Sequence, residues 1–184
     1  IWKLPLGPAE LEDSLRLMWS DFFRCYGAPG REPASRLNLE GMARAGLYLE
    51  LAVVDELEMA RLNGQFLNCF GPTNVLAFPA PEAALGGADI PDGAQSGIPG
   101  AGGPARPAPD GPDEPGGCAA YLGWLALSPD TVRREAMLYG QDRLTHTLRL
   151  LAHGFAHLLG YEHGAEMDAA SNGASGAALA ALPV

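Results

Sequence analysis

The stretch His153–His163, HGFAHLLGYEH, holds three of the four histidines of the chain. Through it and upstream of it, apolar residues recur at steps of three and four, which predicts a helix with one apolar stripe: Leu144, Leu148, Leu151, Phe155 and Leu158. His153 and His157 would project from one face of that helix, because residues four apart are neighbours on it. Gly160 stands where glycine commonly ends a helix in the left-handed conformation, and a turn there could return His163 toward the other two.

Three histidines at this spacing predict a metal site rather than ordinary helix histidines. Zinc accepts nitrogen ligands, and catalytic zinc sites keep three protein ligands and leave one position for water. The cysteines are scattered through the chain, so we expect an open shell held by His153, His157 and His163. The expected catalytic group is the zinc-bound water, because the ion lowers the pKa of that water to about 7. Imidazole also suits nickel and copper, which leaves the identity of the metal open.

The residue after the first histidine separates two kinds of zinc hydrolase. Zinc peptidases with a His-Glu-x-x-His signature carry a glutamate there as the general base. Here the position is Gly154, which has no side chain to accept a proton. A metallopeptidase is therefore the weaker interpretation, and for any hydrolysis the base must come from elsewhere.

The composition predicts one domain over residues 1–184. The length and a hydrophobic content of 47% suffice for a single core. No stretch approaches the roughly 18 apolar residues that span a membrane. Three cysteines without regular spacing give no disulfide framework, so we expect a reducing, cytoplasmic compartment.

The charge argues against a broad nucleic-acid surface. The formal net charge is −10, with 12 basic side chains against 22 acidic ones, whereas a nucleic-acid footprint is basic. Contact with RNA would need a local cluster, and the candidate is the arginine group upstream of the histidines: Arg133, Arg134, Arg143 and Arg149. The other interpretation of this group is a solvated helix face.

Helix and strand patterns alternate along the chain. Amphipathic periodicity predicts a helix over residues 8–26, and Asp55 is placed to cap a second one. Short apolar runs bounded by turn residues predict strands at 46–54, 73–78 and 119–128, and Ser128 or Asp130 can cap the helix that follows. We therefore expect an α/β (α+β) fold, a small sheet with helices packed on it.

Two segments depart from this pattern. From residue 79 to 117, 19 of 39 residues are glycine or proline and six are acidic, which predicts a flexible acidic insertion that cannot bury a core. The end of the chain, 169–184, is rich in small residues, and we expect it to fray.

Taken together, these motifs resemble the YbeY family of bacterial rRNA maturation factors. HGFAHLLGYEH is similar to the family signature His-Gly-x-x-His-Leu-x-Gly-Tyr-Asp-His. LNGQF (62–66) and PTNVLAFP (72–79) resemble the blocks Leu-Asn-x-x-Tyr-Arg and Pro-Thr-Asp-Val-Leu-Ser-Phe-Pro. LGWLALSPDTVRREA (122–136) resembles the Leu-Gly-Asp-Ile-x-Ile-Ser block with the helix after it. The blocks occur in family order and cover roughly Leu47 to Met167, apart from the insertion.

The resemblance carries expectations for fold, site and function. It implies an α/β fold with a small mixed sheet and one zinc held by His153, His157 and His163. It implies a metal-dependent endoribonuclease that acts on single-stranded RNA, in 16S rRNA 3′-end maturation and ribosome quality control in the cytoplasm. The implied partners are an rRNA precursor and the small ribosomal subunit, without a membrane.

Outside the histidine signature, the chain departs from the family blocks at three charged positions. The family arginine falls on Leu67, and leucine cannot meet phosphate charge. The acidic residue of the Leu-Gly-Asp block falls on Trp124, and the aspartate before Val-Leu-Ser-Phe is Asn74. Leu67 and Trp124 favour an alternative in which the protein is a zinc-stabilised ribosome-assembly factor with impaired catalysis. Arg149, one turn before His153, is a candidate replacement phosphate contact.

His146 is the remaining histidine. It lies seven residues before His153, about 10 Å along the helix axis, which is too far for a shared ion. It is either a substrate contact or an exposed helix histidine.

Overall fold

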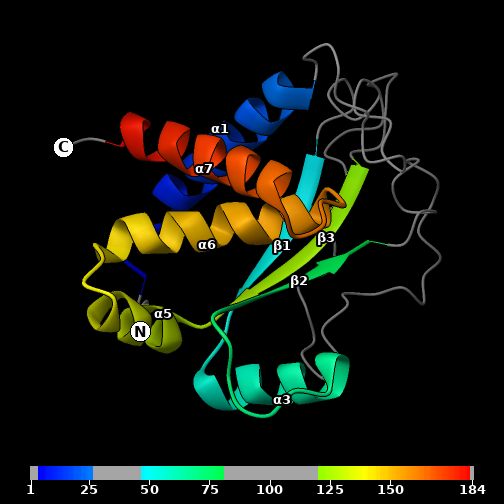
Figure 1. Ribbon diagram of the computed structural model, residues 1–184, viewed down its shortest axis with the longest axis vertical. Coiled ribbons are helices and arrows are strands. Elements are labelled where there is room, and N and C mark those ends of the chain that lie inside the picture. Colours follow the sequence, from blue (N-terminus) through cyan, green and yellow to red (C-terminus); the bar gives the residue numbers. More distant parts are fainter. Residues whose placement is uncertain (1–3, 27–46, 81–119, 183–184) are drawn as a thin grey trace, which may run out of the picture.

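The computed structural model describes residues 4–26, 47–80 and 120–182 (Figure 1). Three strands and five helices lie in these ranges. In chain order they are α1 (Pro8–Tyr26), β1 (Leu47–Val53), α3 (Glu56–Leu67), β2 (Val75–Pro79), β3 (Ala120–Leu127), α5 (Pro129–Leu138), α6 (Arg143–Leu158) and α7 (Ala165–Ala181). None of the described helices is long and apolar enough to span a bilayer.

The sheet is mixed, as expected, with strand order β1-β3-β2. The central strand β3 runs parallel to β1 and antiparallel to β2. Because β3 is paired on both edges and covered on both faces, its residues from Leu122 to Leu127 are all buried. β2 is an edge strand of this sheet, and α6 packs against it.

Helices cover both faces of the sheet. Figure 1 shows α6 on one face with α7 and α1 above it, and α3 on the other face. Side chains alternate along a strand, so Leu125 and Leu127 belong to the core cluster beneath α6, whereas Trp124 and Ala126 belong to the cluster beneath α3. The histidine helix and α3 are therefore separated by the sheet.

The helix caps follow the sequence signals. The Asp55 side chain accepts a hydrogen bond from the Glu58 N–H and caps α3. Ser128 is the N-cap residue of α5, with Pro129 in the first turn, but the Ser128 hydroxyl donates to Thr131 instead of capping. The predicted starts of both helices are confirmed.

Gly123 allows two strands to meet closely. Its φ is +122°, a conformation that side chains rarely adopt, and a Cβ there would lie 2.1 Å from the carbonyl oxygen of Phe78. The register between β1 and β3 also shifts here, between Tyr48 and Leu49. Only glycine fits this position without moving the backbone of β2.

The prediction that residues 169–184 fray was wrong up to residue 181, because α7 spans Ala165–Ala181. Its small side chains let it approach α1 and α6 closely, and one side of α7 is buried through Met167, Ala170, Ala174 and Ala178. Glycine and serine are poor helix formers alone, so this helix depends on packing. The histidine helix α6 is thus followed by a further helix. Beyond residue 80, the predicted 79–117 insertion lies outside the described residues.

Candidate metal centre

Three histidines converge beside the end of α6. His153 and His157 come from the last turns of α6, and His163 comes from the turn before α7. Each offers one ring nitrogen, and these three nitrogens lie within 4.8 Å of one another. The ring centroids are 4.8 Å apart for His153 and His157, 5.3 Å for His153 and His163, and 4.6 Å for His157 and His163. The predicted helix-and-turn cluster is therefore present.

The turn that returns His163 depends on Gly160. α6 ends at Leu158, and Gly160 takes a φ of +83°, as predicted for a helix-ending glycine. The Tyr161 N–H donates to the Ala156 carbonyl at 3.1 Å, which satisfies a carbonyl left over at the helix end. The Tyr161 ring then contacts Phe22 of α1, with centroids 6.0 Å apart. The reversal is thus anchored to the core.

A backbone contact orients His157. Its Nδ1 lies 3.2 Å from the carbonyl oxygen of Tyr161. A carbonyl only accepts, so Nδ1 carries the proton and donates, which leaves the Nε2 lone pair available. This is the arrangement by which metal-binding histidines are usually fixed in one tautomer.

The surroundings favour neutral rings. Burial lowers the pKa of His153, and the neighbouring His157 and His163 lower it further, while Asp168 opposes them. Burial also lowers the pKa of His157, with His163 adding to the effect. Because metal ions bind neutral imidazole, the donor set fits a cation at neutral pH.

Gly154 faces the sheet rather than the histidine cluster. A Cβ on Gly154 would lie 3.0 Å from Leu125 Cδ2 and 3.1 Å from Val75 Cγ2. A glutamate at this position would therefore meet the core between α6 and the sheet. Position 154 therefore cannot supply the general base of a metallopeptidase: glycine has no side chain to accept a proton, and a glutamate there would enter the core.

One carboxylate near the cluster was missed from the sequence. Asp168, an exposed residue in the first turn of α7, acts electrostatically on His153. Glu162 and Glu166 are closer to His163 along the chain, yet neither is among the charges that shift the pKa of His153 or His157. The sequence signal that could have pointed to Asp168 is the chain reversal at Gly160, because it folds the residues after it back toward α6.

His146 takes neither of its predicted roles. It is buried, and its Nε2 lies 3.1 Å from Glu135 Oε2, where it can donate. The same oxygen accepts a hydrogen bond from Asn74 Nδ2 at 3.0 Å. His146, Glu135 and Asn74 thus tie together α6, α5 and the start of β2. The amide that replaces the family aspartate at position 74 is part of this structural network.

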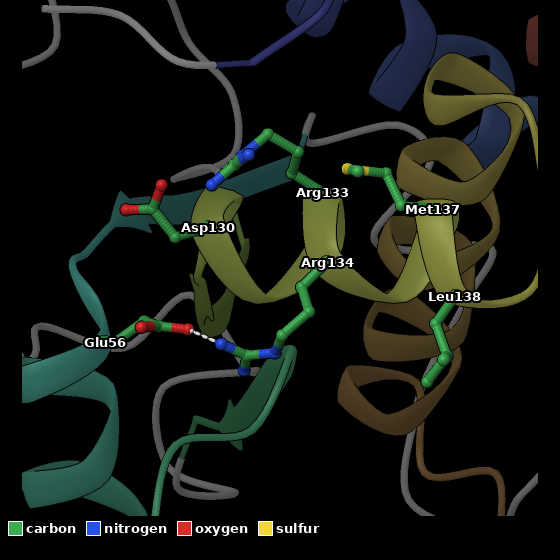
Figure 2. Close-up of a pocket in the computed structure, with 6 residues that line it drawn as sticks. All are labelled: Glu56, Asp130, Arg133, Arg134, Met137 and Leu138. Atoms are coloured by element: carbon green, nitrogen blue, oxygen red, sulfur yellow. Dashed lines mark hydrogen bonds and ion pairs between the residues drawn. The ribbon is translucent and has the colours of Figure 1, made fainter.

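The predicted arginine cluster is divided between elements. Arg149 is exposed on α6, one turn before His153. Arg134 forms an ion pair with Glu56 across to α3. Arg133 and Arg134 of α5 line a hollow of about 710 Å³, together with Glu56 of α3 and with Asp130, Met137 and Leu138. Figure 2 shows these six side chains. The hollow holds as many acids as bases, so it does not form the basic patch that RNA would need.

The two other substitutions lie on the α3 side. Trp124 is buried and stacks on Phe78 of β2, with centroids 3.9 Å apart and planes 11° apart. Leu67 is the last residue of α3 and is 58% exposed. Trp124 is accounted for by core packing on the face opposite α6, so it says nothing against chemistry at the histidines.

Comparisons with known proteins show which family this chain is similar to. The family described as Endoribonuclease YbeY matches residues 34–173. An Endoribonuclease YbeY from Nitratidesulfovibrio vulgaris is 45% identical over 136 residues, covering 73% of this chain and 74% of that protein. One from Oleidesulfovibrio alaskensis is 42% identical over 139 residues, covering 71% and 70%.

A solved structure is a more distant match. The solution structure of TM1509 from Thermotoga maritima covers 96% of this chain and 87% of its own, at 18% identity and a TM-score of 0.49, a likeness too weak to carry an argument. The sequence matches are decisive, since they extend over most of the chain. The range that the family matches, 34–173, contains the positions of all three histidines. The chain belongs to the YbeY family.

Proposed function

We propose that this protein is a zinc-dependent endoribonuclease that cuts single-stranded RNA. Its proposed roles are maturation of the 3′ end of 16S rRNA and ribosome quality control in the cytoplasm, on the small subunit. The observation that carries the proposal is the convergence of His153, His157 and His163, whose ring nitrogens lie within 4.8 Å of one another in a chain of the YbeY family.

The donor set fits a divalent transition metal. Three imidazoles suit zinc, and among the described residues no cysteine or carboxylate joins the three histidines in the cluster. Bound there, the ion would serve as a Lewis acid toward water or a phosphate oxygen. His157 keeps its tautomer through the Tyr161 carbonyl, and burial keeps His153 and His157 ready as neutral ligands.

We assign the phosphate contact and the proton acceptor to two charged side chains outside the histidine cluster. Arg149 lies one turn before His153 on the same helix and is exposed, so its guanidinium can meet a phosphate of the RNA. Asp168 influences His153 from α7, and we assign it the role of accepting a proton from the attacking group. This carboxylate fills the role that Gly154 cannot perform.

A metal-dependent cleavage assay tests the proposal. The purified protein is analysed for metal content by mass and then incubated with an RNA that has single-stranded ends and a duplex stem. We expect one zinc per chain, cleavage confined to the single-stranded part, and loss of both on chelation and in His157→Ala. The control is His146→Gln, which alters the fourth histidine but leaves the cluster intact.

The outcome also separates the enzyme from other functions. Zinc binding without RNA cleavage, together with retained association with the small subunit, would replace the enzyme with a binding factor. Cleavage of peptides by the metal-loaded protein would replace it with a peptidase. Accumulation of 16S rRNA with an unprocessed 3′ end in cells that carry only His157→Ala tests the assigned pathway.

A further inference from the structure

Three aromatic rings contact one another in series on the α3 side of the sheet. Trp124 of β3 is buried and lies flat on Phe78 of β2, with centroids 3.9 Å apart. Phe66 of α3 meets Phe78 edge to face, with centroids 4.9 Å apart and planes 70° apart. The Phe66 ring is therefore held in place from below while 42% of the residue remains exposed.

The series ends in an exposed apolar surface, which we call the aromatic ledge: Phe66, Leu67 and Phe70. Leu67 is 58% exposed, and Phe70 is fully exposed at 106%. Asn68, between them, takes a left-handed conformation and ends α3. Phe70 follows two residues later in the chain. Large exposed apolar groups gathered in so short a stretch are characteristic of binding surfaces.

β2 connects the aromatic ledge to the histidine cluster. Its first residue, Val75, packs against Gly154 of α6, next to His153. Its fourth residue, Phe78, supports Phe66. These two β2 positions are three residues apart, or about 10 Å along the strand. β2 is an edge strand of the described sheet, so this edge is where the two faces of the sheet come nearest to each other.

We propose that the aromatic ledge binds unpaired bases of the RNA that is cut at the histidine cluster. This inference rests on the proposed function and adds to it the part of the substrate that is recognised. Exposed aromatic side chains hold single strands by stacking, which tolerates any base because every base has a flat π-face. A duplex cannot use the aromatic ledge, since its bases are already stacked, so the aromatic ledge contributes to selection of single strands.

The chemistry of the surface favours bases over other occupants. Phe66 offers a ring fixed by Phe78 and Trp124, and a fixed ring loses little entropy when a base stacks on it. The net charge of −10 repels a phosphate backbone, so any binding of RNA at this surface has to come from contacts to the bases, which do not depend on charge. Stacking on the aromatic ledge is such a contact.

Binding of a single-stranded oligonucleotide by catalytically silent protein tests the inference. In a chain that carries His163→Ala, which removes a metal ligand and so prevents cutting, Phe66→Ala and Phe70→Ala should each weaken binding about 5-fold to 150-fold, the usual range for loss of one stacked base. Phe66→Tyr should bind like the parent. The matched control is Leu57→Ala, since Leu57 is 82% exposed at the opposite end of the same helix.

Abasic substrates give a sharper version of the experiment. A single abasic position is moved one nucleotide at a time away from the cut site. For the parent protein, an abasic site at one or two positions of the oligonucleotide should weaken binding by the same factor as Phe66→Ala. In the Phe66→Ala protein those positions should no longer matter, because the stacking partner is already gone.

The outcomes distinguish this inference from the proposed function. If the wild-type chain does not bind or cut RNA, the proposed function fails and the aromatic ledge has no RNA to bind. If it cuts RNA while Phe66→Ala and Phe70→Ala bind as tightly as Leu57→Ala, the inference fails alone. Phe70 is fully exposed, so weak binding by Phe70→Ala with an unchanged melting temperature excludes misfolding as the cause. Loss of self-association in Phe70→Ala without loss of RNA binding would identify a second copy as the occupant and overturn the inference.

Discussion

Gly154→Ala measures how closely the histidine helix packs on the sheet. In the interior of a helix, alanine is favoured over glycine by about 1 kcal/mol. The added Cβ would lie 3.0 Å from Leu125 Cδ2 and 3.1 Å from Val75 Cγ2, whereas carbon atoms in good contact are about 3.5–4.0 Å apart. Leu125 is fully buried, so either its side chain or α6 has to shift to make room.

The magnitude follows from these two opposing contributions. Overpacking a core by one methyl group costs about 1–3 kcal/mol, and the helix preference returns about 1 kcal/mol. Gly154→Ala should therefore lie between neutral and about 2 kcal/mol less stable than wild type. Since all three histidines lie on α6 or on the turn that directly follows it, they should move together, and zinc affinity should change little.

A second glycine provides the matched control. Gly176 lies in the interior of α7, and a Cβ there meets nothing within 4 Å. Gly176→Ala should gain up to about 1 kcal/mol from helix preference alone, so the difference between the two variants isolates the packing cost of about 1–3 kcal/mol. Urea unfolding of the chelated protein, followed by circular dichroism, measures both free energies; zinc affinity is then measured by competition with a chelator.

Two results would refute this reasoning. If Gly154→Ala is as stable as Gly176→Ala, α6 does not pack on the sheet as closely as described. If Gly154→Ala loses zinc affinity tenfold or more, the three ligands do not move as one unit.

Gly154→Glu, which recreates the peptidase signature, should be far less stable and should gain no peptide cleavage, because its carboxylate would enter the core.

Three further predictions concern the site and its support. Gly123→Ala should destabilise the fold by more than about 3 kcal/mol in urea unfolding, because its Cβ would lie 2.1 Å from the Phe78 carbonyl oxygen in a strained backbone; unfolding free energy equal to wild type would contradict the described strand contact. Zinc affinity should hold down to about pH 6.5, the ordinary pKa of histidine, and fall only below it, because the pKa values of His153 and His157 are lowered. A decline in zinc affinity that begins above pH 7, measured by calorimetry, would show that these two pKa values are not lowered. Asp168→Asn should slow single-turnover RNA cleavage about 100-fold or more while zinc content stays at the wild-type level, and an unchanged rate would remove Asp168 from the mechanism.

Local signals in the sequence predicted much of this molecule. The apolar stripe of α6, the glycine after it and the cap at Asp55 all depend on neighbours along the chain, and all are found as predicted. The cluster of three histidines was predictable for the same reason, since two ligands are four residues apart and the third follows a turn that Gly160 makes possible.

Features that depend on distant contacts were not predictable in this way. α7 has few strong helix formers, and only its burial against α1 and α6 explains why it is a helix. His146 gave no sign that Glu135 would meet it from α5. Asp168 carries no motif, and its electrostatic effect on His153 depends on how α7 returns along α6.

The position of the candidate metal centre depends on residues that perform no chemistry. Gly154 sets the distance between α6 and the sheet, and Gly160 reverses the chain toward α7. α7 can only follow that reversal because Ala170 and its other small residues let it lie against α1 and α6. His163 and Asp168 sit at the beginning of this path, so a bulky residue in place of Ala170 should disturb the side of the site that they form while leaving His153 and His157 aligned on α6. The packing of α6 and α7 thus determines the geometry of the histidine cluster. Trp124 belongs to a different core cluster, so its substitution leaves that geometry intact.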